Sequence, residues 1–298
     1  MLTAAVRGKT ILAFLIFSCV LCIWAQEGTY DWNQAEQLFP GIHHAFLDVR
    51  KPRILKVNAV RIDLHRKDLR FMTSGRSPEW GREMPDRPGL PIRVQRQTVR
   101  DYLQNARRNG IDMLIAVNAS PWSPWERPWT HRYACNLGLV VSDGILVDFP
   151  NGRPAFIITK DGKFQIRTVK KGDDISDIQL AVGGFGIILK DGKPAGSKDL
   201  QPRTAYGLSA DRRYLYLLTL DGRLKGISEG AGTKEAGEWL LHFGAWDGIN
   251  MDGGGSTTLM TVRKDSNGKM SAVRLNCGVY FRTVANSLGI YRVRENSK

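Results

Sequence analysis

The residues best suited to chemistry form one segment, Asn-Met-Asp-Gly-Gly-Gly-Ser-Thr-Thr, which runs from Asn250 to Thr258. The carboxylate of Asp252 stands directly before three glycines, and hydroxyl side chains follow them. Consecutive glycine N–H groups can form a concave nest for an anion, and the adjacent carboxylate could transfer a proton or bind hydroxyl groups. A glycine-rich hairpin loop with a turn-forming aspartate explains the same residues, so both interpretations stay open.

Nucleotide binding is a weaker interpretation of this glycine segment. Dinucleotide-binding and P-loop motifs both need a helix after the glycines, and a P-loop also needs a lysine. The residues after Gly255 are Ser-Thr-Thr-Leu-Met-Thr-Val. Because this stretch is rich in β-branched residues, it favours a strand.

Four further residues could bind a polar substrate. Arg203 could hold a phosphodiester or acid group through two parallel N–H bonds, or form a surface salt bridge. Thr204 could add a hydroxyl contact or be an ordinary strand residue. Asn118 and Asn250 could bind sugar hydroxyls, or could hold loops together through backbone hydrogen bonds.

Cleavage of a glycosidic bond usually needs two carboxyl groups, one as acid and one as base or nucleophile. A phosphate leaving group needs less protonation because it is already a stable anion. As partner for Asp252 we select Glu229, with Asp63, Glu126 and Asp247 as alternatives. Each of these four could equally be structural or solvated.

Aromatic residues gather in a proline-rich loop that contains Trp122, Trp125 and Trp129. Their rings could pack on sugar faces or hold cations, or could pin an irregular loop to the core. The histidines show no metal-ligand spacing with one another or with the cysteines, and there is no nucleophile-elbow motif. The sequence therefore implies no metal and no cofactor.

The chain of 298 residues is strongly basic, with a formal net charge of +14 and a pI of about 9.8. This charge favours acidic partners such as phosphate-bearing glycans or acidic polysaccharide, although it could serve solubility alone. No nucleic-acid-binding signature accompanies it. We therefore expect an anionic glycan partner and no nucleic acid.

The first residues resemble a secretory signal. Arg7 and Lys9 precede an apolar run that is too short for a membrane span and typical of a signal-peptide core. We expect residues 1–25 to be a signal peptide, with an uncleaved anchor as the main alternative. The mature protein would be periplasmic or extracellular, without a transmembrane segment; its oligomeric state stays open. Cys135 and Cys277, which remain after cleavage, could pair there.

Beyond this leader the pattern is one of hairpins. Asp-Gly or Asn-Gly pairs between apolar runs predict tight turns, and they occur at 143–144, 161–162, 191–192, 221–222 and 267–268.

Two helices are expected, one after Thr98 that ends near Asn109, and one from Thr233 to Phe243. We predict a lead-in over 26–55 and a single α+β domain over 56–294. Its sheets are mixed and mostly antiparallel, with a few packed helices.

Several segments resemble the phosphodiester glycosidase family in the same order along the chain. Residues 244–256 are similar to its signature of a helix end, an apolar strand and Asn-x-Asp-Gly-Gly-Gly-Ser. Residues 201–207 are similar to its Arg-Thr-Ala-x-Gly segment, with Asp-Gly-Arg following at 221–223. Residues 284–289 are similar to its closing Val-x-Asn-Ala-Leu segment. The resemblance spans about residues 56 to 293.

The resemblance implies a secreted hydrolase that cleaves the glycosidic bond of a sugar 1-phosphodiester or a related acidic glycan. Asp252 would act as acid or base, Glu229 would assist, and Arg203 would neutralise the anion. The residues expected to bind substrate are Asn118, Thr204, Asn250, Gly253, Gly254, Gly255, Ser256 and Trp122. A non-catalytic envelope protein that binds glycan through the same pocket is the alternative.

One departure concerns the pocket wall. The family usually has Asn-Gly-Gly-Phe-Phe where this chain reads Asn118-Ala119-Ser120-Pro121-Trp122. The asparagine is kept and both glycines are lost. The wall should therefore differ from that of other members, and the substrate cannot be copied from them.

Overall fold

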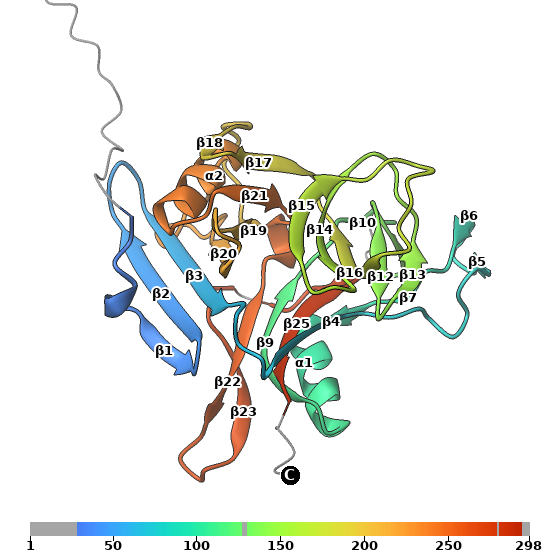
Figure 1. Ribbon diagram of the computed structural model, residues 1–298, viewed down its shortest axis with the longest axis horizontal. Helices are drawn as coiled ribbons and strands as arrows, with labels where there is room; N and C mark the ends of the chain where they lie inside the picture. Colours follow the sequence, from blue (N-terminus) through green and yellow to red (C-terminus); the bar gives the residue numbers. More distant parts are fainter. Residues whose placement is uncertain (1–28, 127–129, 279, 294–298) are drawn as a thin grey trace, which may run out of the picture.

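The computed structural model describes residues 29–126, 130–278 and 280–293. Within these residues every strand pairing is antiparallel, and the helices are two α-helices and two short 3-10 turns. The expected hairpin-built antiparallel sheets are confirmed, with strands far more prominent than helices (Figure 1). The proposed signal peptide lies outside the described residues.

The largest sheet has eight strands. In spatial order they are β1 (Glu36–Phe39), β2 (Ile42–Val49), β3 (Leu55–Asp63), β20 (Tyr214–Leu220), β19 (Arg203–Leu208), β21 (Asp247–Asn250), β17 (Gly186–Lys190) and β18 (Lys193–Pro194). The segment 26–55 thus contributes β1 and β2 to this sheet. A 3-10 turn, η1 (Trp32–Gln34), precedes them.

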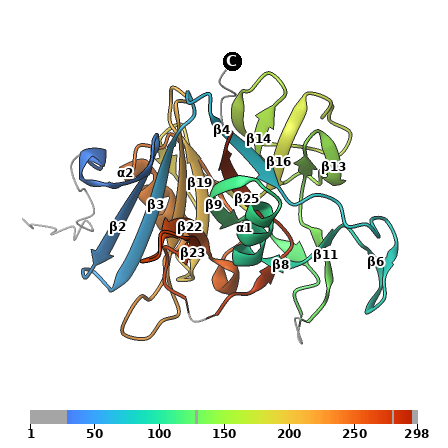
Figure 2. The same cartoon turned by 90° about the horizontal axis from the view of Figure 1, so that it is seen from below.

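Two five-stranded sheets lie beside it (Figures 1 and 2). One contains β13 (Ile145–Asp148), β12 (Val140–Ser142), β16 (Ile178–Gly183), β14 (Pro154–Thr159) and β15 (Phe164–Thr168). The other contains β23 (Met270–Arg274), β22 (Leu259–Lys264), β9 (Asp112–Asn118), β25 (Ser287–Arg292) and β4 (Leu69–Thr73).

Shorter strands complete the described structure. A three-stranded sheet holds β10 (Trp122–Ser123), β11 (Tyr133–Asn136) and β7 (Val94–Gln95). Two pairs remain, β24 (Thr283–Val284) with β8 (Gln97–Thr98), and β5 (Glu83–Met84) with β6 (Arg87–Pro91).

Both predicted helices form. In α1 (Val99–Arg108) the N-cap Thr98 accepts a hydrogen bond from the N–H of Asp101, as a capping threonine should. The second helix, α2 (Thr233–His242), is followed by Gly244 in the left-handed region at φ 103°. Such a glycine lets the chain leave the helix at little steric cost.

The main core joins all three large sheets, because Val60 of β3, Ile115 of β9 and Phe156 of β14 belong to one buried cluster. A second cluster lies on the other face of the eight-stranded sheet, where Leu240 of α2 packs over Ala205 of β19. This sheet is therefore buried on both faces. This burial consequently fixes the start of β19, which carries Arg203 and Thr204, and the end of β21, which carries Asn250.

The hairpin predictions hold at four of five places. The pairs at 143–144, 161–162, 191–192 and 267–268 each connect two neighbouring strands, and the glycines have positive φ. The prediction at Asp221-Gly222 is wrong. Its carboxylate is buried and accepts hydrogen bonds from the side chain of Asn276 at 2.8 Å and the N–H of Cys277 at 2.9 Å. These long-range bonds, not a local turn, decide the conformation there.

Candidate active site

The backbone of Asp252 is held at the junction of two sheets. Asp252 follows β21, and its N–H donates to the carbonyl of Ala119 at 3.0 Å. The side-chain amide of Asn118 donates to the Asp252 carbonyl at 2.7 Å. The Oδ1 of Asn118 accepts bonds from the Thr204 hydroxyl at 2.8 Å and the Thr258 N–H at 3.0 Å. Asn118 is fully buried. Its hydrogen bonds connect the glycine segment to β9 and β19.

The carboxyl group of Asp252 has two hydrogen-bond donors. The indole N–H of Trp122 donates to Oδ2 at 3.1 Å, and the N–H of Gly253 donates to Oδ1 at 3.0 Å. Although the residue keeps some exposed surface, protein atoms surround its carboxyl group, and burial raises its pKa to about 6. The Ser256 hydroxyl, the Gly253 N–H, the charge of Arg282 and the Trp122 N–H oppose this rise. Such a pKa is well placed for proton transfer near neutral pH.

Ser256 has a second notable property. Its hydroxyl favours the ionised Asp252 electrostatically, but among the described residues its oxygen makes no hydrogen bond of acceptable geometry. A hydroxyl group rotates freely, so the proximity of Ser256 to Asp252 accounts for the electrostatic effect without a fixed hydrogen bond. The Ser256 hydroxyl is thus available to a bound group.

Each glycine of the run has different surroundings. A Cβ on Gly253 would lie 2.7 Å from the Pro202 carbonyl oxygen. Gly254 has φ +60°, in the left-handed region. A Cβ on Gly255 would lie 2.6 Å from Nη2 of Arg282 and 2.9 Å from the Tyr280 hydroxyl. The glycines therefore let the backbone approach β19 on one side and a cationic side chain on the other.

Two arginines that the sequence analysis did not select lie over this run. Arg282 is in contact range of Gly255, and the Arg223 Nη1 atom would be 3.4 Å from a Cβ on Gly254. Arg223 also donates to the side chain of Gln201. The N–H of Gly253 already donates to Oδ1 of Asp252 and the N–H of Gly254 donates to the Pro202 carbonyl, so the two guanidinium groups, rather than a nest of free N–H groups, are suited to an anion. The sequence could have identified these arginines by their position in or near the family-like segments at 221–223 and 284–289.

Comparison with known protein families identifies the family of this chain. The profile of the family described as "Phosphodiester glycosidase" matches residues 113–291. The chain belongs to this phosphodiester glycosidase family. Curated proteins gave no significant match.

Two solved structures share the fold of this family member at low identity. The catalytic domain of zebrafish N-acetylglucosamine-1-phosphodiester alpha-N-acetylglucosaminidase, auto-inhibited by its pro-peptide, superposes with a TM-score of 0.60. It is 18% identical, and the match covers 87% of each chain. A hypothetical protein from Synechocystis gives a TM-score of 0.52 at 14% identity, with 85% of this chain and 62% of that chain covered. At these identities the likeness shows the fold alone.

Trp122 gives this member of the phosphodiester glycosidase family a distinct pocket wall. Its side chain is only 4% exposed, so the ring is part of the wall rather than an open platform for a sugar. The guanidinium of Arg96 lies 4.2 Å from the ring centroid. In contrast, Trp125 is 66% exposed, and Trp129 lies outside the described residues.

Arg203 is held by backbone carbonyls at the start of β19. Its Nε donates to Ala231 at 3.0 Å and its Nη2 to Asp199 at 2.7 Å. Burial lowers its pKa. Because successive strand residues point to opposite faces, Arg203 faces the α2 side while the buried Thr204 points toward Asn118. The structure thus brings Thr204 to the backbone of the Asp252 segment, whereas the Arg203 guanidinium lies on the other face.

Asn250 also lies on the α2 side of the sheet. It pairs with Ala205 of β19 and Gly186 of β17, and it alternates with the core residue Ile249. Its Oδ1 is buried without a hydrogen-bond partner in the described part of the chain. Asn250 is therefore close to Asp252 in sequence, but its side chain points to the α2 side of the sheet.

The proposed second carboxylate, Glu229, is exposed. Its backbone is fixed by the Ile54 carbonyl, but no hydrogen bond or ion pair joins its side chain to another described residue. Two alternatives are in ion pairs elsewhere: Asp63 with Arg213 at 3.4 Å, and Glu126 with Arg87 at 3.3 Å.

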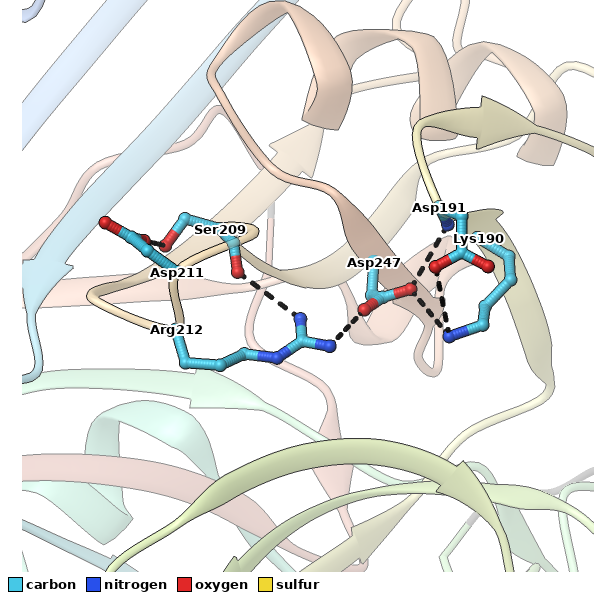
Figure 3. A network of polar contacts seen from close by, with 6 residues as sticks. All are labelled: Lys190, Asp191, Ser209, Asp211, Arg212 and Asp247. Carbon is cyan, nitrogen blue, oxygen red and sulfur yellow. Dashed lines mark hydrogen bonds and ion pairs between the residues drawn. The ribbon is translucent and has the colours of Figure 1, made fainter.

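The remaining alternative, Asp247, belongs to a separate polar network at the other end of β21 (Figure 3). Its carboxylate accepts hydrogen bonds from Lys190 at 3.1 Å, from the N–H of Asp191 at 3.3 Å and from the guanidinium of Arg212. The side chain is 2% exposed. Asp247 is thus a buried structural carboxylate with its acceptors occupied.

Three further features concern metal ligands, the two cysteines and membrane-spanning helices. Within the described residues no group of three or more histidine, cysteine, aspartate or glutamate residues could hold a metal ion. Cys135 and Cys277 are not bonded to each other. No helix among the described residues is both long and apolar enough to cross a membrane.

Proposed function

We propose that this protein is an exported hydrolase that cleaves the glycosidic bond of a sugar 1-phosphodiester or a related acidic glycan. Membership of the phosphodiester glycosidase family supports the reaction class. The observation that carries the proposal is the Asp252 carboxyl group, which has a pKa of about 6 and precedes a glycine run beside which Arg223 and Arg282 lie. The apolar run after Arg7 and Lys9 supports export.

Asp252 acts as the proton acceptor in this proposal. Above pH 6 its carboxylate takes a proton from a water molecule whose oxygen bonds to the anomeric carbon. The bond between that carbon and the glycosidic oxygen breaks, and the phosphate group leaves with the electron pair. Because phosphate is already a stable anion, its departure needs little protonation, which is consistent with the exposed, unpaired position of Glu229.

The anion would lie on the glycine run. Arg282 and Arg223 lie beside Gly255 and Gly254, so their guanidinium groups can neutralise the charge that develops on the leaving phosphate. The Ser256 hydroxyl adds a donor at the same place. Arg203, held by two carbonyls on the other face, contributes positive potential rather than direct contact.

The decisive experiment compares the wild-type protein with Asp252→Asn on a panel of sugar 1-phosphodiesters and p-nitrophenyl glycosides, following release of free sugar. Loss of the base should lower kcat by about 10² to 10⁴-fold while the fold is retained. Asp247→Asn is the matched control, since it removes an aspartate of the same strand that serves structure, and it should keep activity. Retained turnover in Asp252→Asn would refute the assignment.

The alternative, a non-catalytic glycan-binding protein, predicts a different result in the same assay. The altered wall with Trp122 favours it, because a changed pocket need not keep the family reaction. Folded wild-type protein that binds the glycans and releases no sugar over long incubation would select this alternative.

A further inference from the structure

A second polar cleft lies behind the pocket wall, with a volume of about 700 Å³. It is bounded by the end of β4 and the loop after it, by β7 and β8, and by one side of α1; α1 and β8 lie next to each other in Figure 2. This size is within the range of small-molecule sites. No role for this cleft follows from the proposed reaction at Asp252.

The charge of the cleft is positive. Its lining contains Arg76, Arg96 and Arg108 against a single carboxylate, Asp101. That carboxylate is occupied, because it accepts a hydrogen bond from the Thr98 hydroxyl at 2.7 Å. The net potential therefore favours an anionic ligand.

The other polar groups are suited to hydroxyl groups. Gln97 and Asn105 lie in the lining and are joined by a hydrogen bond of 3.2 Å, which fixes both amides. Ser74 is 92% buried, given its exposed fraction of 8%, and its hydroxyl has no hydrogen-bond partner within the described residues. A buried polar group without a partner is costly, so this hydroxyl indicates a place that a ligand atom satisfies.

All three cations have hydrogen-bond partners before any ligand arrives, and the Nη2 of Arg108 donates to Oδ1 of Asn105. The guanidinium of Arg76 lies 3.8 Å from the Trp80 ring centroid, and its Nε donates to the Leu146 carbonyl at 2.6 Å. Arg96 donates to the carbonyls of His131 at 2.9 Å and Thr283 at 3.1 Å. Such preorganisation lowers the entropic cost of binding.

We propose that this cleft is an accessory binding site for an anionic carbohydrate. The arginines bind the acid groups, and the amides with Ser74 bind sugar hydroxyls. Arg96 lines the cleft and also stacks on Trp122, whose N–H contacts Asp252. Only one guanidinium and one indole thus separate the two sites, so one acidic glycan chain can contact both. The binding itself requires no hydrolysis.

The test uses isothermal titration calorimetry at low ionic strength with a galacturonic acid tetramer, and maltotetraose as the neutral probe. In the variant Arg76→Glu with Arg108→Glu the tetramer should bind at least about tenfold more weakly, because two charge-assisted contacts are replaced by repulsion. The control Lys170→Glu with Lys171→Glu makes the same change in net charge at exposed residues outside the lining, and it should bind as the wild type does. Maltotetraose should bind more weakly than the acidic tetramer.

Three outcomes would overturn the proposal: no binding of the acidic tetramer to wild type, equal weakening in both charge-reversed pairs, or unchanged affinity in the Arg76 and Arg108 variant. Asn105→Leu keeps every charge and should also weaken binding; an unchanged affinity would remove the hydroxyl-binding role. The titration measures binding alone, without release of sugar, so it separates failure of this site from failure of the proposed hydrolysis.

Discussion

The indole N–H of Trp122 donates a 3.1 Å hydrogen bond to Oδ2 of Asp252. A hydrogen bond to the ionised form lowers the pKa of a carboxyl group, whereas burial raises it. The pKa of about 6 is the balance between burial and four effects that oppose it, among which the Ser256 hydroxyl, the Gly253 N–H and the charge of Arg282 are larger than the Trp122 N–H. The family motif that this segment resembles has phenylalanine at the position of Trp122, and phenylalanine has no N–H group to donate. The wall residue of this chain therefore adjusts the ionisation of the proposed catalytic group.

Replacing Trp122 with phenylalanine should consequently shift the acidic limb of the kcat/KM profile to higher pH. The ring is kept and the donor is lost, so the pKa of Asp252 rises and a smaller fraction of the protein carries the required base at pH 6. Because the Trp122 N–H is the smallest of the effects that oppose burial, a contribution of about 0.5–1.5 kcal/mol corresponds to a loss of about two- to sevenfold at that pH. Profiles between pH 4 and 9 measure this shift. Trp125→Phe, at an exposed ring, should leave the profile unchanged; identical profiles for all three proteins would contradict the role of Trp122.

Asp252→Asn should make the protein more stable at neutral pH while removing activity. The folded-state pKa of about 6 lies above the ordinary aspartate value of 3.8, so the folded protein disfavours ionisation. Below pH 4 the group is protonated in both states and the substitution changes little. The destabilisation grows as the pH rises from about 4 to 6 and is complete above that range. The difference in Tm between variant and wild type, measured from pH 4 to 8, should therefore increase with pH; a variant that is less stable at pH 7 would contradict this.

The glycine run offers a comparison between two alanine substitutions. In Gly253→Ala the new Cβ meets the backbone oxygen of Pro202 at 2.7 Å, which cannot move without shifting β19, so the free energy of unfolding should fall by about 1–3 kcal/mol. In Gly255→Ala the Cβ meets the end of the flexible Arg282 side chain. That variant should keep its stability and raise KM for a phosphodiester. Chemical denaturation together with steady-state kinetics distinguishes the two effects, and equal destabilisation in both variants would disprove the assignment of Arg282 to the substrate side.

The sequence predicts the local elements well because their signals are local. Thr98 caps α1, and four Asp-Gly or Asn-Gly turns depend on positive φ at adjacent residues. Asp221-Gly222 has the same local pattern, but its carboxylate is bound by Asn276 and Cys277. These partners are more than fifty residues away in the chain, and no local rule finds them.

The residues of the candidate site divide in the same way, into those that local sequence signals identify and those that only the folded chain brings together. Asp252 and its glycines were selected from one segment, whereas Asn118, selected as a substrate-binding residue, holds the Asp252 backbone, as in the alternative interpretation. The arginines over the glycines were not selected, because Arg223 and Arg282 approach from loops that only the folded chain brings together. Arg203 and Thr204 were selected as a pair, yet the pleat of β19 separates their side chains onto opposite faces.

Asp247 should show the opposite pH dependence to Asp252. Burial alone would raise its pKa, but the hydrogen bonds from Arg212 and Lys190 outweigh burial, and the pKa is lowered. A group with a depressed folded-state pKa stabilises the protein above its unfolded-state pKa, and this stabilisation is lost as the pH falls through the folded-state pKa. Asp247→Asn should therefore lower the free energy of unfolding at pH 7 by about 1–3 kcal/mol, with a smaller difference toward pH 3. Urea denaturation at both pH values measures this change.

Because Asp247 and Asp252 lie at opposite ends of one short strand segment, their asparagine variants form a matched pair. Asp247→Asn should lose stability and keep activity, whereas Asp252→Asn should lose activity and gain stability. An Asp247→Asn protein that is as stable as wild type at pH 7 would show that its two cations contribute nothing to the fold.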